Sequence, residues 1–163
     1  MSVSPLVLLL AIAATALDGL LAGASLDQSI KQLPARRRVG AVVYSVYARA
    51  ADLGAGIVWY AALGIGAALL TIAGAIAAWA QAAPSSVGAP LYLAALASLA
   101  HSFITSRAAP AMLAQRHMPA IAENKAKLAA LFDRFERWQA ARAILQVATF
   151  GLMLWALAAV ALR

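Results

Sequence analysis

The chain has 163 residues, of which 64% are apolar and 12% charged, and its 13 basic and 6 acidic residues give a net charge of +7. A soluble domain is about 45–50% apolar and about 25% charged, so this composition, with a mean hydropathy of +0.83, excludes a soluble enzyme and a disordered chain. The absence of cysteine excludes a disulfide scaffold, thiolate metal sites and thiol nucleophiles. We therefore interpret the chain as an integral membrane protein.

Four stretches of the sequence are long enough to span a membrane, which requires about 20 mostly apolar residues. They cover residues 4–26, 54–81, 89–106 and 143–162. No basic residue precedes the first stretch, which is also too long for the apolar core of a signal peptide, so we expect it to be retained. The sequence predicts an all-α fold: one domain over residues 1–163, built as a bundle of four transmembrane helices.

The basic residues are concentrated in two of the connections between these stretches. Five lie between the first and second stretches and seven between the third and fourth, so twelve of the 13 fall on one side. Cytoplasmic connections carry such an excess of Lys and Arg. We therefore expect a multi-pass protein of the bacterial inner (plasma) membrane with both termini outside. This topology accounts for the basic charge, so no nucleic-acid partner is expected.

The two basic connections have the character of helical extensions. No proline occurs from Val39 to Gln81, or after Pro119, so we expect helices 2 and 4 to extend into the cytoplasm. In the extension of helix 4, apolar residues recur at spacings of three and four, which indicates one helix face: Ile121, Leu128, Leu131, Phe132, Phe135 and Trp138. We expect this face to pack against helix 2, with a partner or the membrane surface as alternatives. The prolines at 34, 84, 90, 110 and 119 are expected between elements.

Polar residues inside the apolar stretches are candidates for function, because they are costly at membrane depth. At ~1.5 Å per residue, Asp18 and His101 both reach the cytoplasmic half of the bilayer. The candidate ligand-binding cluster at this level comprises Asp18, Tyr60, Ser98, His101, Ser102, Thr105, Arg142 and Gln146. The cluster either lines a cavity for a small molecule or forms interhelical hydrogen bonds. The sequence does not fix whether Asp18 and His101 meet, and it assigns no catalytic residue.

The run KQLPARRR is expected at the membrane surface, where Lys31, Arg36, Arg37 and Arg38 would contact anionic headgroups. No cofactor or metal is expected. Haem in a helix bundle commonly needs two axial ligands on facing helices, and the second histidine, His117, falls in a polar connection. The sequence also lacks the helical His/Glu motifs of metal sites.

Several short motifs resemble one known family. They are the LLAG run at Leu20 to Gly23, the pair Leu33-Pro34, and RFERWQAARAILQVATF, in which Phe135, Trp138 and Arg142 form an aromatic–x–x–Trp–x–x–x–Arg pattern. Together they resemble the anthrone oxygenase-like family of bacterial and fungal four-helix membrane proteins, long classed as a domain of unknown function. The resemblance implies a four-helix membrane fold. A few members of that family are implicated in oxygenating polyketide anthrones without an obvious cofactor.

Three classes of function remain open, and the sequence does not decide whether the chain is an enzyme. The favoured class is a noncatalytic membrane protein that binds a hydrophobic small molecule or lipid, or serves as an accessory subunit of a membrane partner. The second is a small, cofactor-independent, oxygenase-like membrane enzyme acting on an apolar substrate. The third is a proton-coupled transporter, which would need a homo-oligomer because four helices leave little room for a pathway.

Overall fold

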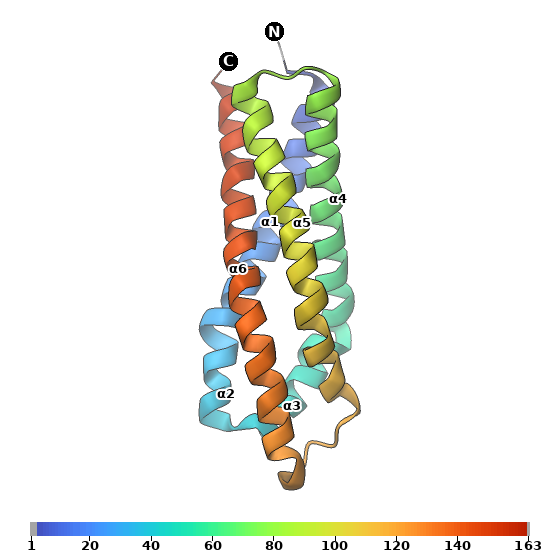
Figure 1. The fold of residues 1–163 in the computed structure, drawn as a ribbon, viewed down its shortest axis with the longest axis vertical. Helices are drawn as coiled ribbons and strands as arrows, with labels where there is room; N and C mark the ends of the chain where they lie inside the picture. The colour runs from blue at the N-terminus through green and yellow to red at the C-terminus, as the bar shows by residue number, and fades with distance from the viewer. Residues whose placement is uncertain (1–2, 163) are drawn as a thin grey trace.

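A computed structural model of the chain describes residues 3–162, and all regular elements within this range are helical (Figure 1). The α-helices are α1 (Pro5–Asp27), α2 (Leu33–Val39), α3 (Ala41–Ala50), α4 (Gly56–Ala80), α5 (Ser85–Ala114) and α6 (Lys125–Ala161). Two π-helical turns, Gln28–Gln32 and Ala51–Ala55, join α1 to α2 and α3 to α4. Two 3-10 turns, Gln115–His117 and Ala122–Asn124, lie between α5 and α6.

The long helices α1, α4, α5 and α6 run side by side as a four-helix bundle (Figure 1). Each helix packs against two others, so that α1 and α5 both contact α4 and α6. Four continuous helical runs are long and apolar enough to cross a membrane: Pro5–Val39, Ala41–Ala80, Ser85–His117 and Ala122–Ala161. The expectation of an all-α, four-helix protein is confirmed, and each predicted apolar stretch lies in one of these runs to within one residue at its ends.

The bundle has two dissimilar ends. The start of α1, the end of α6 and the short turn between α4 and α5 lie together at one end (Figure 1). The hairpin of α2 and α3 and the longer α5–α6 connection lie at the other end. The two connections that carry most of the basic residues therefore share one end of the molecule.

The helices of the hairpin end extend further than the prolines suggested. Pro90 and Pro110 lie inside α5, and Pro34 lies in the first turn of α2, so the prediction that these three separate elements is wrong. A proline is tolerated in the first turn because its missing N–H would have no intrahelical partner there. Because Pro90 and Pro110 do not end the helix, α5 continues to Ala114, eight residues past the predicted end of its apolar stretch at residue 106.

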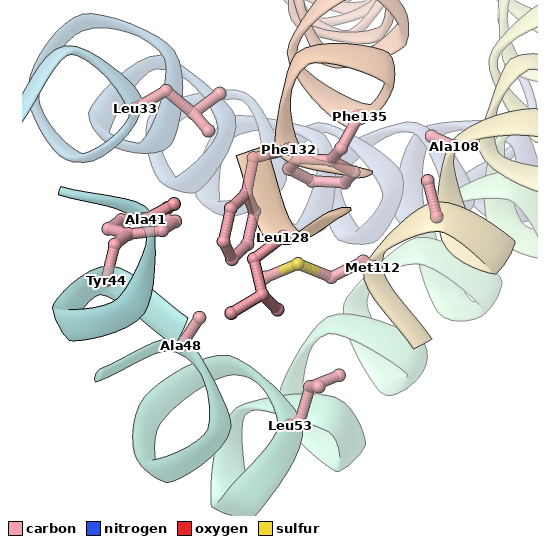
Figure 2. Close-up of a cluster of buried hydrophobic side chains, with 11 residues drawn as sticks. Leu33, Ala41, Tyr44, Ala48, Leu53, Ala108, Met112, Leu128, Phe132 and Phe135 are labelled. Carbon is pink, nitrogen blue, oxygen red and sulfur yellow. The ribbon is translucent and has the colours of Figure 1, made fainter. Parts of the chain in front are cut away.

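A buried apolar cluster holds the hairpin against α5 and α6 (Figure 2). The ring of Phe132 meets that of Tyr44 edge-on, with ring centroids 4.9 Å apart. Leu128 and Phe132 of α6 lie between Tyr44 of α3 and Met112 of α5 (Figure 2). The predicted packing of the α6 face on the extension of helix 2 is confirmed for the central positions, although Ile121 is 49% exposed.

At the other end of the bundle the core consists mainly of small side chains, which bring the helices close together. Its buried members are Val7, Ala11, Ala14, Ala75, Ala78, Val87, Leu91, Ala94, Met153 and Ala156. Near the middle of the bundle, a Cβ at Gly19 would lie 2.9 Å from the ring of Phe150. The absence of a side chain at Gly19 therefore lets the Phe150 ring of α6 pack directly on α1.

Candidate functional site

A pocket of about 220 Å³ lies in the bundle next to the hairpin. Its lining comes from both π-helical turns and from α4, α5 and α6: Gln28, Asp52, Leu53, Ile57, Tyr60, Ala61, Thr105, Ala109, Met112, Leu113, Phe135 and Arg142. Ala61 of α4 and Leu113 of α5 are exposed, so the mouth of the pocket lies between these two helices. The polar side chains Gln28 and Asp52 are buried on the inner side.

The two π-helical turns supply these inner polar groups. Gln28 begins the first turn and Asp52 is the second residue of the next. The turn at Asp52 depends on glycine: Gly54 has a non-helical backbone (φ −86°, ψ −121°), and a Cβ at Gly56 would lie 2.5 Å from the carbonyl oxygen of Ala51. Single π-turns inside α-helices occur frequently at functional sites.

A short polar chain connects three elements at the bottom of the pocket. Gln28 Nε2 donates to Asp52 Oδ2 at 3.5 Å, and Arg142 Nη2 donates to Gln28 Oε1 at 3.3 Å. The guanidinium of Arg142 also lies 5.9 Å from the centroid of Phe135, a cation–π contact. Arg142 Nε is buried without a hydrogen-bond partner. Within the described part of the chain, Asp52 and Arg142 form no direct ion pair.

A second polar group lies behind the pocket wall, between α5 and α6. Thr105, which lines the pocket, has its hydroxyl 3.1 Å from His101 Nε2. The side-chain nitrogen of Gln146 lies 2.7 Å from the same imidazole atom. Five predicted site residues thus fall in or behind the pocket: Tyr60, His101, Thr105, Arg142 and Gln146.

The remaining members of the predicted cluster lie outside this site. Asp18 is 4% exposed and accepts a hydrogen bond of 2.9 Å from Thr71 Oγ1. Among residues 3–162, no hydrogen bond joins Asp18 to His101. The hydroxyl of Ser102 donates to the carbonyl oxygen of Ser98 within α5. These hydrogen bonds of Asp18 and Ser102 are therefore interhelical and intrahelical, respectively, and Ser98 takes part through its backbone carbonyl oxygen.

The predicted membrane-surface residues divide into one buried and three exposed side chains. Arg36 is 6% exposed, and its Nη2 lies 2.7 Å from Asp133 Oδ1 and 2.8 Å from Glu136 Oε2. Arg37 pairs with Glu136 as well, and Lys31 pairs with Asp27 one turn before it. Arg38 is exposed. The structure therefore uses Arg36 to join α2 to α6.

Sequence reasoning did not include Gln28, Asp52 and Phe135 in the site. Gln28 and Asp52 flank the first two apolar stretches in the sequence, so they were counted with the connections. Phe135 was assigned to the packing face of α6, where it is indeed buried. A signal was present, because Asp52 precedes two glycines that are close together, Gly54 and Gly56. Such a pair in a helical pattern lowers the cost of an irregular turn.

The arrangement is suited to holding an organic molecule with a polar group. In the described range no three His, Asp or Glu side chains come together as a metal site would require. The pocket offers one carboxylate, one guanidinium, one amide and the Tyr60 and Thr105 hydroxyls, next to apolar side chains.

Comparison of the chain with models of known families, with curated proteins and with solved structures finds no match.

Proposed function

We propose that this protein is a multi-pass protein of the bacterial inner membrane that binds a hydrophobic small molecule or lipid in the pocket between α4 and α5. The observation that carries the proposal is the mixed wall of this pocket. Apolar side chains such as Ile57 and Met112 line it beside the buried Asp52 and the guanidinium of Arg142. Ligand sites are typically apolar cavities with a few convergent polar groups.

The proposed orientation has both termini outside and the α2–α3 hairpin in the cytoplasm. It is supported by the basic residues of the two long connections, which share the hairpin end of the molecule. In this orientation the pocket lies near the cytoplasmic boundary of the bilayer. Because its mouth lies between two apolar helices, a ligand would enter from the lipid rather than from water.

The family resemblance supports the same site. Two of the three residues that form its aromatic–x–x–Trp–x–x–x–Arg pattern, Phe135 and Arg142, line the pocket. The resemblance does not by itself assign oxygenation to this chain, since the pocket residues suffice for binding and no reacting group is identified. We therefore propose binding as the function.

Filling the pocket tests this proposal. Ala109 lines the pocket on α5 and is partly buried, so the ring in Ala109→Phe would occupy the ligand's space. We expect native mass spectrometry of the wild type, released from nonionic detergent, to show a bound apolar molecule that the variant has lost.

Two further variants make the test specific. Ala100→Phe adds the same ring to an exposed position of α5 outside the pocket lining, and this variant should keep the ligand. Ala61→Phe narrows the mouth from α4, where the side chain is exposed and folding is least affected. A ligand retained in both Ala109→Phe and Ala61→Phe would show that binding occurs elsewhere, and a wild-type protein that never carries one would contradict the proposal.

A further inference from the structure

One negative and one positive side chain, Asp52 and Arg142, lie at the bottom of the pocket, and their hydrogen bonds within the protein are long. Asp52 is 8% exposed, and its hydrogen bond from Gln28 measures 3.5 Å. The bond from Arg142 to Gln28 measures 3.3 Å, and Arg142 Nε has no partner. Good N–H···O bonds measure about 2.7–3.2 Å, so both contacts are weak. Buried charges of this kind are costly until strong hydrogen bonds satisfy them.

Gln28 bridges the two charged groups without neutralising either. Its amide donates to Asp52 and accepts from Arg142, while the carboxylate and the guanidinium make no direct ion pair in the described structure. Because both charged groups line the pocket, a ligand in it meets an acceptor-only group and a donor-only group together. The hydroxyls of Tyr60 and Thr105 can each donate or accept on the adjacent walls.

We infer that the ligand is an amphiphile with a neutral head that both donates and accepts hydrogen bonds, such as an alcohol. This inference rests on the proposed function of the pocket and specifies its ligand class. A hydroxyl would accept from Arg142 and donate to Asp52 at the same time. An anionic head attracted by Arg142 would also be repelled by Asp52, and a cationic head attracted by Asp52 would be repelled by Arg142, so neither gains enough to offset the loss of its own hydration. Like charges placed together in an interface are strongly unfavourable.

The size of the pocket agrees with a head and part of a tail. Its volume of about 220 Å³ is smaller than the ~300–1,000 Å³ of sites that enclose a drug-sized ligand. Apolar side chains lie at the mouth, where Leu113 and Ala61 are exposed. The tail of an amphiphile would therefore leave between α4 and α5 into the surrounding lipid.

Three probes with one tail and different heads test this inference: 1-decanol, decyl sulfate and decylamine. An equimolar mixture is added to the purified full-length protein in nonionic detergent, and bound probes are counted by native mass spectrometry. We expect the wild type to retain decanol about tenfold or more over either charged probe, which corresponds to a difference of ~1.4 kcal/mol in binding free energy. Retention of decyl sulfate or decylamine at or above the level of decanol would overturn the inference.

Charge variants identify the groups responsible. Asp52→Asn should shift the preference toward decyl sulfate, and Arg142→Gln should shift it toward decylamine. Glu123→Gln removes the same charge as Asp52→Asn at an exposed position outside the pocket and should leave the preference for decanol unchanged. An unchanged order in Asp52→Asn would contradict the inference. If no probe binds the wild type, the proposed function itself fails, which distinguishes the two outcomes.

Discussion

Arg36 shows how one buried charge ties distant parts of this chain together. Its guanidinium reaches Asp133 and Glu136, about one hundred positions later in the sequence, and donates to the carbonyl oxygen of Ala129 at 3.3 Å. It also lies 5.7 Å from the ring centroid of Phe132. The planar guanidinium allows several such contacts at once, which a lysine at this position would not. Arg36 is thus the main polar connection between α2 and α6.

Removing this side chain should loosen the hairpin. In Arg36→Met the two carboxylates lose their shared partner, at a cost of roughly 2 kcal/mol, below the ~3–5 kcal/mol of a fully buried pair because Asp133 is 58% exposed. Amide hydrogen exchange in residues 33–50 should then accelerate about tenfold or more.

The exposed neighbour Arg38 provides the matched control for this measurement. Arg38→Met removes the same charge from the same helix but should leave the exchange of residues 33–50 unchanged. Equal acceleration in both variants would mean that the loss of basic charge, rather than the contacts of Arg36, loosens the hairpin.

The side-chain contacts of single residues could not be predicted from the sequence. Arg36, Arg37 and Arg38 are identical in type and adjacent, and Arg36 differs from the others by its burial and by its contact with the distant Asp133. Depth along a helix placed Asp18 and His101 at one level, but depth does not give the direction of a side chain. Their partners, Thr71 and Gln146, come from different helices, so the contacts depended on packing that the sequence alone does not contain.

The hairpin between α2 and α3 depends on the conformation of one glycine. Gly40 has φ 85° and ψ 156°, a region that is essentially restricted to glycine because a Cβ would clash with its own backbone. No neighbouring atom lies within 4 Å of where a Cβ would be. The requirement for glycine at this position is therefore one of backbone conformation and not of space.

Gly40→Ala should consequently destabilise the protein although the added methyl group touches nothing. We expect a loss of about 1–3 kcal/mol, measured as a lower thermal unfolding midpoint in detergent. Gly64→Ala is the control, since Gly64 lies within α4 and a Cβ there also meets nothing within 4 Å. That change should be neutral or stabilising, by up to ~1 kcal/mol. A neutral Gly40→Ala would refute the conformational argument.

Element types were predictable from the sequence, and their irregularities were not. Apolar stretches and helical spacing identified all four long helices and the packing of the α6 extension. The absence of proline from Val39 to Gln81 indicated a continuous helix, and the closely spaced Gly54 and Gly56 were compatible with an irregular turn without specifying a π-turn. Such a turn leaves the spacing of apolar residues nearly unchanged, although Asp52 is buried in the pocket. The polar groups at the bottom of the pocket were therefore not predictable from the spacing of apolar residues.

The orientation of the whole molecule in the membrane can be tested with single cysteines, because the sequence has none of its own. Ser85 begins α5 at the end shared by the chain termini, and Ala126 lies near the start of α6 at the hairpin end; both are exposed. With both termini outside, we expect a membrane-impermeant maleimide to label Ser85→Cys in intact spheroplasts. It should label Ala126→Cys only after the membrane is permeabilised, and the reverse pattern would invert the proposed topology.

The first and last helices meet at one end of the bundle, where Val3 and Val160 pack against the same apolar cluster. Closely placed ends allow circular permutation. A short linker from the end of α6 to the start of α1, with the chain reopened between α5 and α6, would keep every helix contact. The new ends would then emerge at the hairpin end, so the permuted chain would have to insert with the opposite terminal topology. Such a chain would show whether the membrane topology depends on the order of the helices along the chain or on their packing in the bundle.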